Sequence, residues 1–155
     1  MDDSAVRDRE ARTADTLAML TTQGIDVWVA TASAEGGPYL VPVSLAWVDD
    51  RAVIAVADSS LTARNLKRSG EARLAVGPTR DVVMIVAVLA DVIDVASDEA
   101  LGAAYIAQAD WDPRHDTGYV FLVLRPVRIQ AWREANEIPG RTLMRDGAWL
   151  SEMEA

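Results

Sequence analysis

The chain has 155 residues, half of them hydrophobic, and its 24 acidic and 15 basic residues give a formal net charge of −9. This composition is typical of a globular protein and excludes wholesale disorder. There is no cysteine and one histidine, His115, which excludes disulfides, thiolate metal sites, Cys nucleophiles and His-rich metal sites. The acidic balance argues against non-specific nucleic-acid binding, because that binding needs Lys and Arg to displace counterions from phosphates.

The sequence predicts neither a leader nor a membrane-spanning segment. Its first ten residues are acidic and polar, unlike a signal peptide. Its longest apolar runs, such as residues 82–90, are far shorter than the roughly 18 residues that a membrane helix needs. We therefore expect a cytoplasmic protein that forms one domain over residues 1–155 and has neither a membrane nor a nucleic acid as partner.

In chain order, a helix is followed mainly by strands. An approximate 3.6-residue apolar period predicts a helix over residues 7–22, carried by Ala11, Ala14, Leu17, Ala18 and Leu20. Strands are predicted over 26–33, 39–48, 51–57, 73–76, 81–95 and 118–133, helices over 61–68 and 99–108, and a small hairpin at 145–147. Because strands follow one another in hairpin succession and parallel βαβ alternation is absent, the expected fold is mainly β (α+β), an antiparallel sheet or barrel with added helices.

Local signals mark the ends of these elements. Asp49 and Asp50 predict a tight hairpin, residues 58–60 predict a helix N-cap, and Gly70 predicts the end of that helix. In the strand predicted over 39–48, the odd positions are large and apolar and the even positions are mostly small. This alternation predicts that the odd face packs a core and that the even face leaves room for a ligand.

The helix start at residues 58–68 is the best candidate site. Ser59, Ser60 and Thr62 place hydroxyls and free amides where the helix dipole favours anions, and Arg64 and Lys67 add charged donors. The alternative is an ordinary capped helix with exposed basic residues, and the residues alone leave both interpretations open.

Side chains that could catalyse a reaction by themselves are scarce. His115 has acidic neighbours and could act as a general base, but an exposed loop histidine is the interpretation that we favour. There is no nucleophile elbow, no phosphate-binding glycine loop and no pair of acids at a metal-binding spacing. We therefore predict no catalytic side chain and no metal site, and the reactive atom of an enzyme would belong to a cofactor.

Several ordered motifs resemble one family. Residues 27–31, 37–47, 62–66 and 80–83, with the tail Trp132, Arg141 and 146–149, are similar to the pyridoxamine 5'-phosphate oxidase-like superfamily of flavin and deazaflavin proteins. This resemblance implies a six-stranded antiparallel split β-barrel with Greek-key order and flanking helices. It places a helix within residues 1–24 and a hairpin and tail in 134–155. It also implies a homodimer with FMN or a deazaflavin coenzyme at the subunit interface.

The resemblance also implies which residues touch the cofactor. Val41, Pro42, Val43 and Ser44 would lie along the ring; Ser59, Ser60, Thr62, Arg64 and Asn65 would hold the phosphate side; Arg80 and Asp81 would touch the polar edge of the ring; Trp132 and Arg141 would come from the partner.

The chain also departs from the oxidases proper. Val41 and Ala46 stand where the oxidases have Arg and Lys, and Thr62 replaces a further Lys. Each missing charge-assisted contact to phosphate would weaken FMN binding by about 1.5–3 kcal/mol. The oxidases' terminal substrate-binding motif is not recognisable, so pyridoxamine phosphate oxidase activity itself is not expected.

Three functions remain open. The favoured one is an FMN- or deazaflavin-dependent oxidoreductase that transfers a hydride to a small organic substrate. The alternative is a non-catalytic protein of the same fold that binds or carries a flavin-like or haem-like ligand. The third is a barrel without cofactor that acts through protein contacts.

Overall fold

The computed structural model describes residues 5–153. Its helices are α1 (Arg9–Leu20), α2 (Leu61–Ser69) and α3 (Glu99–Ala109), with two short 3₁₀ turns, η1 (Pro113–His115) and η2 (Ala135–Glu137). Its strands are β1 (Asp26–Ala32), β2 (Pro38–Ser44), β3 (Ala46–Val48), β4 (Arg51–Ala57), β5 (Glu71–Val76), β6 (Val82–Asp94), β7 (Tyr119–Trp132), β8 (Thr142–Arg145) and β9 (Ala148–Trp149).

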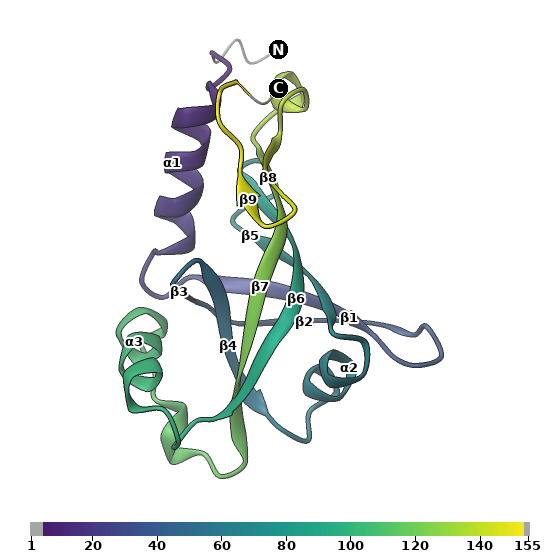
Figure 1. The fold of residues 1–155 in the computed structure, drawn as a ribbon, viewed down its shortest axis with the longest axis vertical. Helices are drawn as coiled ribbons and strands as arrows, with labels where there is room; N and C mark the ends of the chain where they lie inside the picture. Colours follow the sequence, from purple (N-terminus) through teal and green to yellow (C-terminus); the bar gives the residue numbers. More distant parts are fainter. Residues whose placement is uncertain (1–4, 154–155) are drawn as a thin grey trace.

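All of these strands belong to one antiparallel sheet. Its order is β2-β1-β5-β6-β7-β4-β3, and β8 and β9 continue from β7. Within the described residues, six strands are six residues or longer, namely β1, β2, β4, β5, β6 and β7. Figure 1 shows α1 beside β8 and β9 at one end of the molecule and α2 and α3 on opposite sides of the other end. The predicted mainly β fold with flanking helices is confirmed.

The sheet closes through one residue. β2 and β3 are the two ends of the strand order, yet only Leu45 separates them in sequence. Leu45 is fully buried, and its N–H donates to the carbonyl of Ile25 over 3.1 Å. The chain thus leaves one edge of the sheet and enters the other, and the seam of the resulting barrel lies between β2 and β4. The prediction of one continuous strand over 39–48 is therefore wrong at Leu45, where the alternation breaks because Leu45 and Ala46 are both buried.

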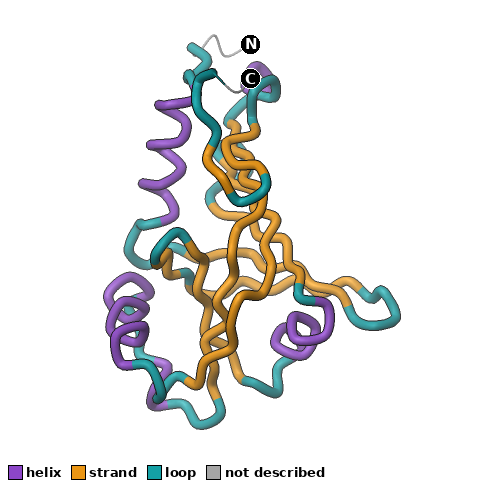
Figure 2. The backbone as a smooth tube through the Cα atoms, in the orientation of Figure 1, coloured by secondary structure: helices purple, strands orange, loops and turns teal. Residues whose placement is uncertain are grey.

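The predicted turns and caps position the remaining elements. Asp49 and Asp50 both have positive φ, 52° and 57°, as a two-residue hairpin of the I′ type requires. Ser60 caps α2, and Gly70 ends it in the left-handed conformation with φ 72°. Figure 2 shows that the loop between β1 and β2 projects away from the barrel, whereas α2 and α3 stay close to its strands.

The predicted N-terminal helix is confirmed as α1, and its buried residues are Arg12, Thr16 and Leu20. Of the residues that carried its apolar period, Leu20 is buried, Leu17 is half-buried and the alanines at 11, 14 and 18 are exposed, so the buried face is mostly polar. The reason is that Arg12, only 3% exposed, donates to backbone carbonyls, at 3.3 Å to Ala131 and 3.0 Å to Glu137. Burial lowers the pKa of Arg12.

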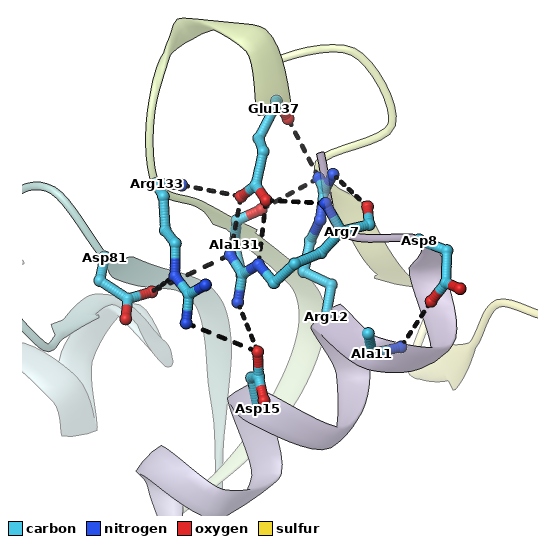
Figure 3. Close-up of polar contacts among 9 residues, drawn as sticks. All are labelled: Arg7, Asp8, Ala11, Arg12, Asp15, Asp81, Ala131, Arg133 and Glu137. Atoms are coloured by element: carbon cyan, nitrogen blue, oxygen red, sulfur yellow. Dashed lines mark hydrogen bonds and ion pairs between the residues drawn. The ribbon is translucent and has the colours of Figure 1, made fainter. Parts of the chain in front are cut away.

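A buried carboxylate ties α1 to the end of β7 (Figure 3). Glu137 accepts hydrogen bonds from the Arg7 guanidinium, at 2.9 Å to Nε and 2.7 Å to Nη2, and from the backbone N–H of Arg133 at 2.9 Å. The side-chain hydrogen bonds from Arg7 lower the pKa of Glu137 to about 2. Arg7 also pairs with Asp15 at 3.1 Å. We name this ion-pair network the Glu137 network.

No helix within residues 5–153 combines the length and apolarity that crossing a bilayer requires.

Candidate functional site

A cavity of about 420 Å³ opens at the seam between β2 and β4. We name it the split cavity. It is lined by β2, β4, the start of α2 and the loop before β7, through Tyr39, Val41, Val43, Ser44, Ala55, Val56, Ala57, Ser60, Thr62, Trp111 and Tyr119. Five of the residues predicted to bind a cofactor therefore meet here: Val41, Val43, Ser44, Ser60 and Thr62.

The cavity is lined mainly by the odd positions of β2, with Ser44 as its one even position. The register places Val41 beside Val29 and Val43 beside Val27, and both β1 residues are fully buried, so the odd positions face the barrel interior. Because β2 has no hydrogen-bonded partner on its second side, this interior face stays open at the seam. Leu40 is 58% exposed and Pro42 is also exposed on the outer face. The prediction that the odd positions pack a core is confirmed, since Val41 and Val43 pack against the buried cluster, whereas the prediction that the even face leaves room for a ligand stays a prediction.

The start of α2 brings hydrogen-bond donors to the split cavity. Ser60 has an extended backbone, and its hydroxyl accepts from the N–H of Ala63 at 3.2 Å. The first N–H groups of a helix have no acceptor within the helix, and the helix dipole favours an anion there. Thr62 is buried, lines the cavity and makes no side-chain hydrogen bond to another described residue. This end of the cavity is suited to an anionic group.

The other predicted residues of the helix segment lie outside this cavity. Asn65 is buried, and its Nδ2 donates to Oγ1 of Thr31 at 3.1 Å, which anchors α2 to β1. Ser59 and Arg64 are exposed and do not line the cavity. Lys67, a charged donor in the same segment, forms an ion pair with Asp58.

Asp81 belongs to the Glu137 network and Arg80 lies beside that network; neither is part of the split cavity. Arg80 is exposed and donates to Glu134 at 2.6 Å, and this hydrogen bond raises its pKa. Asp81 pairs with Arg133 at 3.3 Å, as Figure 3 shows. Neither residue lines the split cavity within one protomer.

Trp132 and Arg141 meet in a second, smaller cavity of about 180 Å³ on the outer face of the sheet. The guanidinium of Arg141 lies over the indole of Trp132, 5.3 Å from the ring centroid, which is a cation–π geometry. Arg73, Arg128, Met84 and Val86 are among the other lining residues. We name this the arginine cavity.

Aromatic residues that the sequence analysis did not assign form one wall of the split cavity. Trp111 lies edge-on to Tyr119 with ring centroids 6.0 Å apart, and edge-on to the buried Tyr105 at 6.1 Å. Burial raises the pKa of Tyr105 to about 12, which keeps its hydroxyl neutral. The one sequence signal for this wall was Trp111 itself, a tryptophan in an otherwise polar loop.

His115, in the same loop, is 84% exposed at its side chain and lies 3.4 Å from Asp112.

The largest of the cavities described here, about 600 Å³, lies between α3 and strands β4 and β6. None of the predicted cofactor residues lines it. Within the described residues, no group of three or more His, Asp or Glu side chains is arranged to hold a metal ion. Volume alone therefore does not select the site, whereas the combination of predicted residues and a helix start selects the split cavity.

Comparison with known proteins identifies the family. The family model of pyridoxamine 5'-phosphate oxidase matches residues 15–133, more than half of the chain. The chain belongs to the pyridoxamine 5'-phosphate oxidase family. The resemblance seen in the sequence motifs is thereby confirmed. Among curated proteins, none matches the sequence.

Solved structures share the fold of this family member. An F420 reductase has a TM-score of 0.60 at 18% identity, over 71% of this chain and 92% of its own. A heme binding protein from Mycobacterium smegmatis has a TM-score of 0.59 at 23% identity, over 89% of this chain and 58% of its own. HutZ, the heme storage protein from Vibrio cholerae, has a TM-score of 0.59 at 15% identity, over 77% of this chain and 91% of its own. At these identities the likeness concerns the fold alone.

Proposed function

We propose that this member of the pyridoxamine 5'-phosphate oxidase family binds FMN or a deazaflavin coenzyme in the split cavity and acts as an oxidoreductase on a small organic substrate. One observation carries the proposal: the cavity is lined both by apolar and aromatic side chains and by the start of α2. A planar ring suits Val41, Val43 and Trp111, and a phosphate suits the N–H groups and hydroxyls at Ser60 and Thr62.

The chain's own residues would bind and orient such a cofactor. A bound flavin or deazaflavin supplies a ring that accepts and donates a hydride. Val41 and Val43 would exclude water from one side of the ring, and Ser44 would donate a hydrogen bond to a polar ring atom. The residues that line the cavity include neither a carboxylate nor a histidine. We therefore assign no acid–base role to any of them.

The second candidate is a non-catalytic carrier of a flavin-like or haem-like ligand. The same lack of carboxylate and histidine side chains in the lining favours it, and so does the similarity to two structures described as heme-binding and heme-storage proteins. Turnover with a chemical or enzymatic reductant distinguishes the two candidates once a ligand is bound.

Titration with FMN and with the deazaflavin coenzyme tests the ligand site. We expect saturable binding, followed by visible absorption and fluorescence, and at least tenfold weaker binding for Val41→Trp, because the larger side chain fills part of the split cavity. Val92→Trp is the matched control, since Val92 is a half-exposed β6 residue in none of the cavities described here. Equal affinities for the two variants would contradict the assignment of the ligand to the split cavity.

The outer sheet face supports a homodimer. Paired positions place Pro42, Trp28, Ala75 and Met84 in one row across four strands, and Leu40 lies in the next row. Leu40, Trp28 and Met84 are 58%, 49% and 37% exposed, and large apolar side chains exposed on neighbouring strands favour an interface. We propose that a second copy covers it and brings its Trp132 and Arg141 toward the bound cofactor.

Light scattering after size-exclusion chromatography checks the dimer. We expect twice the chain mass of 16.8 kDa for the wild type and the mass of a single chain for Leu40→Glu. The reason is that a carboxylate buried in this face opposes association. Val92→Glu, away from this face, should stay dimeric. A monomeric wild type at micromolar concentration would contradict the proposal.

A further inference from the structure

The arginine cavity contains two arginines, Arg73 and Arg128, besides the predicted cofactor residues Trp132 and Arg141. Strand register places Arg73 of β5 and Arg128 of β7 on either side of Val86 of β6, all three on the outer face. Strands lie about 4.8 Å apart, so the Cα atoms of the two arginines are about 10 Å apart. Arg141 lines the same cavity. Three guanidinium groups therefore line a space of about 180 Å³.

These charges are not neutralised by the protein. Within the described residues, Arg73, Arg128 and Arg141 form no ion pair, although the whole chain has an excess of nine acidic residues. No carboxylate lines the cavity. Glu71, two residues before Arg73 on the same strand face, does not pair with it. Like charges that share a cavity repel one another, and a bound anion removes that repulsion.

The walls hold part of this charge in place. Arg141 is held over Trp132 by the cation–π contact, and Gln130 is fixed by a hydrogen bond from its Nε2 to Oγ1 of Thr142 at 3.1 Å. Arginine binds phosphate and carboxylate groups with two parallel hydrogen bonds, which suits planar and tetrahedral oxyanions. Met84 and Val86 add an apolar surface for a short carbon skeleton.

We propose that the arginine cavity is an anion-binding site for a small molecule that bears two or more phosphate or carboxylate groups. A volume of about 180 Å³ fits a small ligand rather than a polymer. This goes beyond the proposed function, because it gives Arg73 and Arg128 a role, although the cavity shares Trp132 and Arg141 with the cofactor contact proposed above. The site would place such an anion beside Trp132, on the face that the partner covers.

Isothermal titration calorimetry of the full chain with inorganic pyrophosphate and with citrate tests the site. We expect the wild type to bind at least one of them, with affinity falling as salt is added, and at least tenfold weaker binding for the double variant Arg73→Gln/Arg128→Gln. The matched control is Arg51→Gln/Arg145→Gln, which removes two exposed strand arginines outside the cavity and should change the affinity less than twofold.

Three outcomes would overturn the proposal. The first is a wild type that binds neither anion. The second is equal weakening in the two double variants, which would assign binding to overall charge. The third is binding that survives Arg73→Gln/Arg128→Gln and is lost in Thr62→Val, which would assign the anion to the split cavity. Because the titration contains no flavin, its result does not depend on whether the proposed function holds.

Discussion

Replacing Glu137 by alanine should lower the free energy of unfolding by about 3–5 kcal/mol, because it leaves the guanidinium of Arg7 without its buried partner. Glu137 is 3% exposed and accepts hydrogen bonds from Arg7 and from the backbone of Arg133. Urea denaturation at pH 7 measures the change. Glu134→Ala is the matched control: it removes a carboxylate three residues earlier, whose partner Arg80 is exposed, and should change stability little.

The effect of Glu137→Ala should depend on pH with a definite sign. The pKa of Glu137 falls from an ordinary value of 4.5 to about 2 in the folded state, so its stabilisation is complete above about pH 4.5 and is lost as the pH falls toward 2. Each pKa unit corresponds to about 1.4 kcal/mol, which makes this contribution on the order of 3 kcal/mol. The stabilities of wild type and variant should therefore converge as the pH falls from 4.5 toward 2. A difference that stays constant from pH 7 to pH 3 would contradict the carboxylate's role.

Asn65→Ala and Thr62→Val should separate stability from affinity, although the sequence analysis placed both residues at the phosphate. Asn65→Ala leaves the buried Thr31 hydroxyl without its donor and should cost about 1–3 kcal/mol of folding stability. Thr62→Val keeps the side-chain shape and breaks no hydrogen bond to another described residue. If its hydroxyl contacts a charged ligand group, its loss weakens binding by about 1.5–3 kcal/mol, roughly 10- to 100-fold.

For each variant, the melting temperature is measured by thermal unfolding in the absence of ligand, and the dissociation constant is measured by cofactor titration. We expect Asn65→Ala to lower the melting temperature and Thr62→Val to leave it nearly unchanged. A double-mutant cycle of Asn65→Ala with Thr31→Val isolates the coupling between α2 and β1. An Asn65→Ala protein of wild-type stability with weakened cofactor binding would instead return Asn65 to the ligand site.

Elements set by local chemistry were predictable from the sequence. The Asp49–Asp50 hairpin, the Ser60 cap and the Gly70 helix end each depend on a few neighbouring residues, and each is confirmed. The long strands β6 and β7 also follow from their apolar runs. Five of the residues that the family motifs indicated line the split cavity.

Features that depend on distant partners were not predictable. Alternation in β2 correctly predicts that the odd positions face the core, but the opening of that face to a cavity depends on the missing strand partner at the seam with β4. Arg12 is buried because carbonyl groups of residues 131 and 137 accept its hydrogen bonds, and no local pattern shows that. The same holds for Asp81, whose partner Arg133 lies far from it in the sequence, just after β7.

The single residue between β2 and β3 has a consequence for folding kinetics. Hairpins β1–β2 and β5–β6 join near neighbours in sequence, whereas β1–β5 and β4–β7 join segments such as residues 27 with 76 and 52 with 124. Leu45 links two local hairpins covalently, because β2 pairs with β1 and β3 pairs with β4, each close by in sequence. The barrel closes only when the long-range pairings β1–β5 and β4–β7 also form. Loop-closure entropy is therefore lost before most of the contacts form, and such topologies fold in milliseconds to seconds.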